Sequence, residues 1–121
     1  MESGLRRPEG LACDWVNNKI YWTDSETKRI EVTSVDPDPI IRRVLFWDGI
    51  DLPRAIVVSP NDGVMFWSDW GDVPKIERAS MNGDPTSRKV IVKEVISFFK
   101  VRLNKQTKSY KLLTFLANSI L

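Results

Sequence analysis

The chain repeats itself at an interval of 45 residues, and this repeat constrains its fold more than any local feature. The stretch Lys19–Asp24 reads Lys-Ile-Tyr-Trp-Thr-Asp, and Val64–Asp69 reads Val-Met-Phe-Trp-Ser-Asp. Trp22 and Trp67 are therefore 45 residues apart. Self-similarity at a period of this size is typical of propellers and solenoid arrays. We expect two copies of one supersecondary unit.

Each copy contains four short apolar runs that read as β-strands. The runs are rich in Val, Ile, Tyr, Phe and Trp and are separated by Gly, Pro, Asn and Asp, which favour turns. In a strand, alternate side chains point to opposite faces, so Tyr21 and Thr23 share one face and Trp22 and Asp24 the other. The sequence thus predicts an all-β fold made of two four-stranded units.

The aspartate that ends each motif is interpreted as structural, because a strand-end Asp readily accepts hydrogen bonds from nearby backbone N–H groups. A metal or catalytic role is less favoured, since no second carboxylate stands at ligand spacing. The residues assigned to the structural motif are Tyr21, Trp22, Thr23, Asp24, Phe66, Trp67, Ser68 and Asp69.

The chain divides into four parts. Residues 1–7 precede the first repeat, which covers 8–49; the second repeat covers 50–94, and a tail follows over 95–121. Residues 1–94 carry 13 basic and 16 acidic side chains, a net charge of −3, whereas the tail carries five basic side chains and no acidic one. Since the tail has no third copy of the motif, we expect that it is not native to the repeat fold.

The tail ends in an apolar stretch whose spacing is helical. Its apolar positions are Leu112, Leu113, Phe115, Leu116, Ile120 and Leu121. We interpret the tail as either helical or disordered. A basic amphipathic helix could lie on an anionic membrane surface, but we favour a poorly ordered, adhesive extension, because ten residues are too few to span a bilayer.

Composition argues against catalysis. The chain has no His, which rules out a His-based triad or a His metal site, and it has no Gly-rich phosphate loop. We therefore predict no enzyme activity, no cofactor and no metal. The net negative charge of the repeats argues against nucleic-acid binding. Cys13, the one cysteine, is expected to be a small buried residue on an inner strand.

Neither a secretory signal nor a membrane span is expected in the repeats. The first seven residues have no apolar core after their charges. The longest apolar run before residue 95 is far shorter than the roughly 20 residues that a transmembrane helix needs.

Seven short stretches carry a family resemblance: Ser3–Leu5, Pro8–Trp15, Tyr21–Thr27, Arg29–Val32, Val44–Trp47, Pro53–Ile56 and Asp69–Ala79. In their order and spacing they resemble the YWTD (LDL-receptor class B) repeat family. The resemblance covers about residues 3–94, and it is strongest to the first extracellular propeller of the Wnt co-receptors within this family. Phe66 and Ser68 replace the Tyr and Thr of the second motif, and Val35–Pro39 replaces an Asn-Leu-Asp-Gly turn.

This resemblance implies a six-bladed β-propeller of which the chain supplies two blades. It implies Wnt ligands and secreted Wnt antagonists as partners, with a Frizzled-type receptor involved indirectly. It places the parent protein on the extracellular side of the plasma membrane, attached through parts that this chain lacks. Ligand-binding candidates on the top face are Glu26, Lys28, Arg54, Trp70, Asp72 and Arg78.

Three of these residues have an alternative role. Trp70 is either a ligand anchor, as buried aromatic side chains often are in interfaces, or a residue that covers the neighbouring blade. Arg54 and Arg78 either line the top face or pair with Glu77 and Asp72, in surface ion pairs that contribute little.

Three functions are compatible with this reading. The first is a protein-binding fragment of a Wnt co-receptor, without catalysis. The second is a truncated, non-functional or dominant-negative product, because repeat arrays generally need about three units and two units leave apolar outer faces bare. The third is an endocytic binding fragment of the LDL-receptor type.

Overall fold

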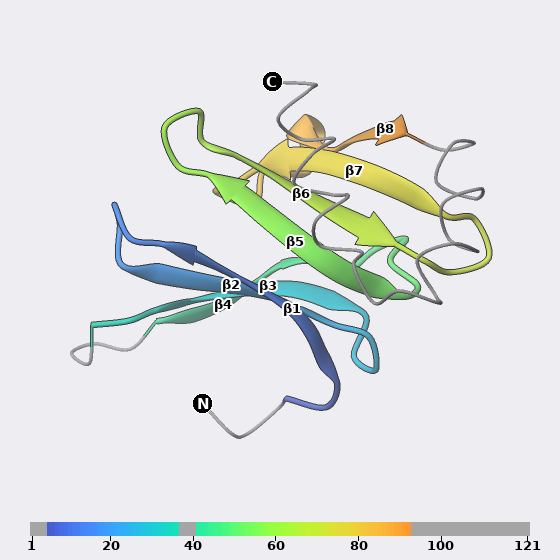
Figure 1. Ribbon diagram of the computed structural model, residues 1–121, viewed down its shortest axis with the longest axis horizontal. Coiled ribbons are helices and arrows are strands. Elements are labelled where there is room, and N and C mark those ends of the chain that lie inside the picture. Colours follow the sequence, from blue (N-terminus) through green and yellow to red (C-terminus); the bar gives the residue numbers. More distant parts are fainter. Residues whose placement is uncertain (1–4, 37–40, 93–121) are drawn as a thin grey trace.

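The computed structural model describes residues 5–36 and 41–92, which form two four-stranded antiparallel sheets (Figure 1). The prediction of an all-β fold with two four-stranded units is confirmed. The interpretations of residues 95–121, and most of the altered connection at Val35–Pro39, lie outside the described residues. The strands are β1 (Pro8–Asp14), β2 (Lys19–Asp24), β3 (Arg29–Ser34), β4 (Arg42–Phe46), β5 (Pro53–Ser59), β6 (Val64–Asp69), β7 (Lys75–Ser80) and β8 (Lys89–Val92), with a 3-10 helix, η1 (Pro85–Ser87), before β8.

Each sheet is built from consecutive strands, in the order β1-β2-β3-β4 and β5-β6-β7-β8. The two copies of the motif are the second strands, β2 and β6. The turns that lead into them need a left-handed residue at the same repeat position. Asn18 has a φ of 53° and Gly63 a φ of 68°, and Asn and Gly are the residues that adopt this conformation most readily.

A bulge between the third and fourth strands recurs in both sheets. In the first sheet the register shifts between Ile30 and Glu31, so that Ile30 pairs with Phe46 and Glu31 with Val44. In the second sheet it shifts between Ile76 and Glu77. The extra residue turns Phe46 to the same side of its sheet as Ile30, where both side chains are buried.

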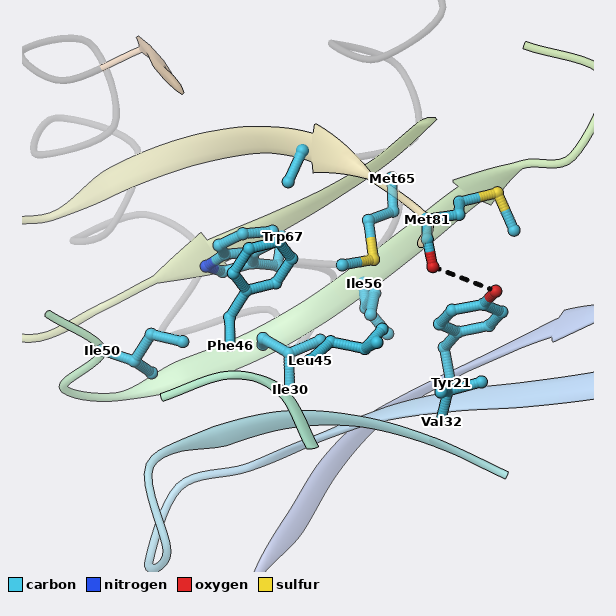
Figure 2. Close-up of a cluster of buried hydrophobic side chains, with 11 residues drawn as sticks. Tyr21, Ile30, Val32, Leu45, Phe46, Ile50, Ile56, Met65, Trp67 and Met81 are labelled. Carbon is cyan, nitrogen blue, oxygen red and sulfur yellow. Dashed lines mark hydrogen bonds between the residues drawn. The ribbon is translucent and has the colours of Figure 1, made fainter. Parts of the chain in front are cut away.

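The sheets stack face to face, and the main apolar core lies between them (Figure 2). Tyr21, on the first sheet, and Trp67, on the second, belong to this core. The Trp67 ring stacks on Phe46 with 5.4 Å between ring centroids. The face of the first sheet that carries Tyr21 therefore packs against the face of the second sheet that carries Trp67. The buried core residues are Tyr21, Ile30, Val32, Leu45, Phe46, Ile50, Ile56, Met65, Trp67, Ala79 and Met81.

Where the first strands of the two sheets approach each other, a threonine hydroxyl joins them. Thr23 Oγ1 accepts a hydrogen bond from the Gly10 N–H (2.9 Å) and donates one to the Arg54 carbonyl oxygen (2.6 Å). A Cβ atom at Gly10 would overlap that carbonyl oxygen. The close approach of β1 to β5 therefore requires glycine at position 10.

The expectation that Cys13 is buried is wrong, because its thiol is exposed. Ala12 packs against the core between the sheets. Since neighbouring residues of a strand face opposite ways, Cys13 and Leu11 point away from the second sheet. Leu11 is 63% exposed, whereas Ile56, at the same repeat position in the second sheet, is 5% exposed. Whether residues at this strand position are buried depends on the presence of a neighbouring sheet, and the sequence of the strand alone does not reveal it.

The second sheet has a smaller apolar cluster on the face turned away from the first sheet. It consists of Ala55, Phe66, Trp70 and Ile76, with Val57, Val64, Ile91 and Val92 partly buried against it. We call these residues the outer cluster.

Candidate ligand-binding face

The end of the first sheet that carries Asp24 is held together by this carboxylate. Asp24 accepts backbone N–H bonds from Arg6 (2.8 Å), Arg7 (3.1 Å), Glu26 (3.0 Å) and Thr27 (3.0 Å). The first two precede β1 and the last two follow β2, so one side chain fixes two separate segments. Burial raises the pKa of Asp24, but the four N–H donors outweigh it, and the net effect is a lowered pKa.

Asp69 does the same for the second sheet. It accepts backbone N–H bonds from Asp51 (2.9 Å), Leu52 (2.9 Å) and Gly71 (3.0 Å). The segment before β5 is thereby tied to the turn after β6. Both strand-end aspartates thus organise the loops at one end of the two-sheet stack, which we call the Asp end.

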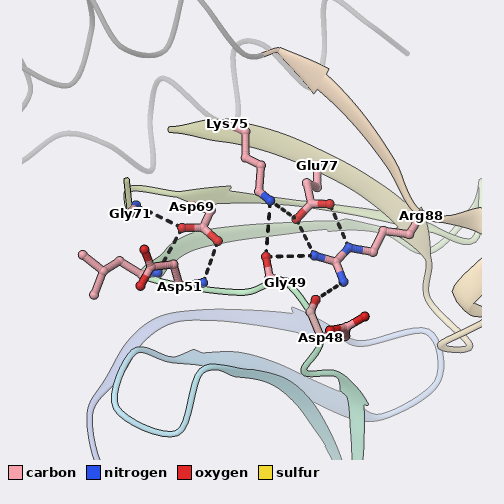
Figure 3. A network of polar contacts seen from close by, with 9 residues as sticks. Asp48, Gly49, Asp51, Asp69, Gly71, Lys75, Glu77 and Arg88 are labelled. Carbon is pink, nitrogen blue, oxygen red and sulfur yellow. Dashed lines mark hydrogen bonds and ion pairs between the residues drawn. The ribbon is translucent and has the colours of Figure 1, made fainter. Parts of the chain in front are cut away.

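A pocket of about 300 Å³ opens at the Asp end between loops of both sheets, and charged side chains make up much of its lining. Asp51 lines this pocket and lies beside Asp69 and Gly71 (Figure 3). Its carboxylate accepts from Lys28 Nζ (3.2 Å) and from the Asp72 backbone N–H (3.1 Å), and it lies so close to Gly71 that a Cβ there would overlap it. Asp51 therefore connects the loops after β2, β4 and β6. The pocket is lined by Lys28, Gly49, Ile50, Asp51, Asp69, Asp72, Val73 and Lys75.

The structure brings some of the candidate residues together at this end. Lys28 and Asp72 line the same pocket, and both are exposed. Glu26 is exposed two residues before Lys28, in the turn between β2 and β3. Arg54 is exposed on β5, next to Pro53, which pairs with Asp69. These four residues are accessible on or near the Asp end.

Trp70 requires a correction, because its side chain is only 2% exposed. It packs with Phe66 and Ile76 in the outer cluster, so its ring is not presented as a surface anchor. The chain turns directly after β6, and Asp69 binds the Gly71 N–H in this turn. This turn directs the Trp70 ring to the sheet rather than to the loops.

Arg78 also requires a correction, because it lies away from the pocket. Strand β7 runs from Lys75, which pairs with Asp69, to Ser80, which pairs with Val64 at the opposite end. Arg78 lines a separate hollow at that opposite end together with Asp62 and Ser80. Antiparallel pairing thus separates it from Lys28 and Asp72.

One alternative for Arg54 and Arg78 is an ion pair with Glu77 or Asp72, but Glu77 pairs with Arg88 and Lys75. Arg88 Nε and Nη2 donate to the two carboxylate oxygens of Glu77 at 2.7 and 2.8 Å, and Lys75 Nζ lies 3.7 Å from Glu77. Arg88 also donates to the backbone carbonyls of Asp48 and Gly49, which belong to the loop after the first sheet (Figure 3). This network joins the two sheets below the pocket.

The sequence contains a signal for this network outside the two motifs, in the spacing of Glu and Arg. Glu31 and Arg42 are eleven residues apart, and so are Glu77 and Arg88. Arg42 likewise binds Glu31, at 3.1 and 3.3 Å, and its guanidinium lies 5.3 Å from the Trp22 ring centroid. Arg88 lies 5.6 Å from Trp67. Each repeat therefore contains a Trp–Glu–Arg unit.

Within residues 5–36 and 41–92, no group of three or more Cys, Asp or Glu side chains is placed to hold a metal ion. The same ranges contain no helix with the length and apolarity to cross a membrane. The arrangement at the Asp end offers charged side chains and backbone groups around a small pocket, which suits recognition of a polar protein loop.

Comparison with known proteins agrees with the repeat and the two sheets. The family model described as low-density lipoprotein receptor repeat class B matches residues 18–59 and 63–97, more than half of the chain. The chain belongs to this family. Each match begins close to the second strand of a sheet, and the first runs on into β5. The sequence unit of the family thus crosses from one sheet to the next.

Among curated proteins, the chain is similar to low-density lipoprotein receptor-related protein 5. Identity is 57% over 72 residues to the mouse protein and 57% over 70 residues to the human protein. These alignments cover 60% and 58% of this chain but only 4% of each relative. This class B repeat chain therefore corresponds to a small part of a much longer receptor-related protein.

Among solved structures, the chain is similar to one chain of the crystal structure of a nidogen/laminin complex. The TM-score is 0.71 at 41% sequence identity, over 78% of this chain and 35% of that chain. That neighbour is a β-propeller. The two stacked sheets of the class B repeats are thus propeller blades.

Proposed function

We propose that this chain is a ligand-recognition fragment of a Wnt co-receptor-like protein and that the Asp end is its binding face. The observation that carries the proposal is the pocket between Lys28, Asp51 and Asp72, which is built by loops of both sheets. The similarity to receptor-related protein 5 supports a receptor role. The family consists of binding domains, and we propose recognition without catalysis.

The partners follow from the same similarity. Wnt ligands and secreted Wnt antagonists are the proposed ligands, and a Frizzled-type receptor would be engaged indirectly. The parent protein would act on the extracellular side of the plasma membrane. Acidic Asp72 and Glu26 would face basic groups of the ligand, and Lys28 would face a carboxylate or a carbonyl oxygen.

Binding of the full chain to an immobilised secreted Wnt antagonist tests this proposal by biolayer interferometry. We expect K28E and D72K each to weaken binding by at least about tenfold, since reversing a charge at a contacted pair makes attraction into repulsion. R78E is the matched control, because Arg78 is charged and lies at the other end of the sheet. Equal losses in all three variants, or no binding by the unaltered chain, would contradict the proposal.

A further inference from the structure

We propose that a second copy of this chain docks the outer face of its first sheet on the outer cluster of the second sheet, through the same type of contact that joins the two sheets within one chain. The surfaces involved are the flat faces of the two-sheet stack and not the loops of the Asp end, so this association is separate from ligand recognition.

The outer cluster repeats the surface that the first sheet presents to the second. Five apolar residues in or against the first-sheet side of the core have an apolar counterpart in the outer cluster at the same repeat position. Val32 is the exception, because its counterpart is Arg78, which is half-buried. An arginine can pack its stem on an apolar surface while its charged end stays in water. The matching pairs are Tyr21 and Phe66, Ile30 and Ile76, Leu45 and Ile91, Phe46 and Val92, and Ala12 and Val57.

The outer face of the first sheet repeats the opposite half of the same core. Its residues stand at the repeat positions of the second-sheet residues that pack on the first sheet. The outer cluster and this face therefore correspond to two surfaces that already contact each other within the chain. We call Leu11, Ile20, Trp22, Thr33 and Val35 the Leu11 face; their counterparts in the core are Ile56, Met65, Trp67, Ala79 and Met81, in that order.

Two positions on the Leu11 face show what a neighbouring sheet changes. Leu11 is 63% exposed, whereas its counterpart Ile56 is 5% exposed. Val35 is 54% exposed, whereas its counterpart Met81 is 9% exposed. Trp22 is already buried within its own sheet, so Leu11 and Val35 are the side chains that docking would remove from water. Exposed apolar patches of this kind mark interaction sites.

A buried hydroxyl on the second sheet supports the same docking. Ser68 Oγ accepts the Ala55 N–H (3.1 Å), as Thr23 Oγ1 accepts the Gly10 N–H. Thr23 also donates to the Arg54 carbonyl oxygen of the neighbouring sheet. Within residues 5–36 and 41–92, the Ser68 hydroxyl, 2% exposed, donates to no acceptor. In the docked pair it would donate to the Glu9 carbonyl oxygen of the second copy, which stands at the repeat position of Arg54.

Ala55 limits the strength of this contact. It stands at the repeat position of Gly10, where a Cβ atom would overlap the carbonyl oxygen of the neighbouring sheet. The Ala55 methyl group would therefore hold a docked copy farther away than β1 and β5 lie within one chain. Association between copies is weaker than packing within the chain for this reason.

Contact between the outer cluster and the Leu11 face joins two different surfaces. Such a heterologous contact produces rings or open arrays rather than a symmetric pair, because each copy has both surfaces. A variant that loses one surface keeps the other, and this property separates the proposed contact from general adhesion.

Sedimentation velocity of the full chain over a series of concentrations tests the proposal. We expect the sedimentation coefficient to rise with concentration. L11K should weaken association by at least about tenfold, since docking would bury its charge on the outer cluster. V16K is the matched control, because Val16 is 60% exposed in the turn after β1 and its counterpart Asn61 is exposed. A single monomeric species at all concentrations, or equal losses in L11K and V16K, would overturn the proposal.

The variant A55G tests the geometry of the contact. Without the Ala55 methyl group the second copy can approach as closely as β5 approaches β1, so we expect association to strengthen by at least about fivefold. The same sedimentation series measures it. Adhesion through exposed apolar side chains alone would not respond to this change, so unchanged or weaker association of A55G would contradict the proposal.

Mixing two variants tests whether two different surfaces meet. V57K places a charge on the outer cluster and leaves the Leu11 face intact, whereas L11K does the reverse. We expect each variant alone to be monomeric and their mixture to form a 1:1 complex and nothing larger. A mixture that stays monomeric would contradict the proposal. If circular dichroism shows that V57K is unfolded, the A55G comparison decides alone.

Discussion

The two repeats have nearly the same sequence pattern but occupy different environments. Comparing them separates the contacts that form within one blade from those that need a neighbouring blade. Both contain the Trp–Glu–Arg unit. In the second repeat this unit faces the first sheet, and Arg88 binds carbonyls of the loop at Asp48 and Gly49. In the first repeat the unit lies on the face turned away from the second sheet, and Arg42 covers its own tryptophan. The same three residues thus form an intrasheet cover in one place and an intersheet contact in the other.

The largest expected effect on stability is a difference between alanine substitutions at Trp67 and at Trp22. W67A should destabilise the chain by about 3–5 kcal/mol, because it opens a cavity between the sheets where Trp67 stacks on Phe46. W22A should cost less, since its cavity lies under the Arg42 side chain, which can settle into it. Urea unfolding followed by circular dichroism measures both. Equal losses of unfolding free energy in W67A and W22A would mean that contact between the sheets stabilises a tryptophan no more than burial within one sheet does.

The two arginines give the next largest effect. R88M should cost about 1.5–3 kcal/mol, the range for hydrogen bonds to charged groups, because Glu77 loses its bidentate partner and two loop carbonyls lose a donor. R42M removes the Glu31 partner and the cover of Trp22, both of which belong to the first sheet. The same unfolding experiment is expected to rank R88M above R42M. The reverse order would show that Arg42 carries an additional role.

Gly10 and Ala55 occupy the same repeat position and differ in their surroundings, because Gly10 lies where β1 approaches β5. G10A should cost about 1–3 kcal/mol, because its methyl group would overlap the Arg54 carbonyl oxygen and force β1 and β5 apart. The second repeat has Ala55 at the same position, and A55G should cost only about 0.5–1 kcal/mol through backbone entropy. Thermal unfolding compares the two. If G10A unfolds at the same temperature as the unaltered chain, the two sheets can move apart without losing stability.

The smallest effect concerns pH and Asp24. The pKa of Asp24 is lowered in the folded chain, so its carboxylate favours the folded state above the pKa of the unfolded chain. This stabilisation is lost as the pH falls through the folded pKa. D24N should flatten the acid side of the stability–pH curve, because an amide oxygen does not change charge there. Urea midpoints between pH 7 and pH 3 provide the measurement, and parallel curves for the two proteins would contradict the assignment.

Much of the fold was predictable from the sequence because the repeat aligns the two motifs residue by residue. Trp22 and Trp67, Thr23 and Ser68, and Asp24 and Asp69 fall at equivalent strand positions. The hydrogen bonds of Asp24 and Asp69 follow from the ordinary chemistry of a strand-end carboxylate.

The candidate site was predictable only in part, because strand direction and neighbouring sheets decide it. Arg78 and Asp72 are close in sequence, but antiparallel pairing carries Arg78 towards the opposite end. Trp70 directly follows the motif, yet the turn directs its ring into the outer cluster. Asp51, which connects three loops at the pocket, lies outside the motif and has no period or spacing that marks it.

The packing of the Trp67 face on the Tyr21 face gives the two-sheet stack a direction. One end displays the face that a preceding unit would meet, and the other end displays the face that a following unit would meet. A tandem duplication of the coding unit can therefore lengthen such a stack without a new type of interface, because each added copy packs through the contact already present. A copy added in the reverse orientation would not meet a matching face, so all copies in the stack have the same orientation.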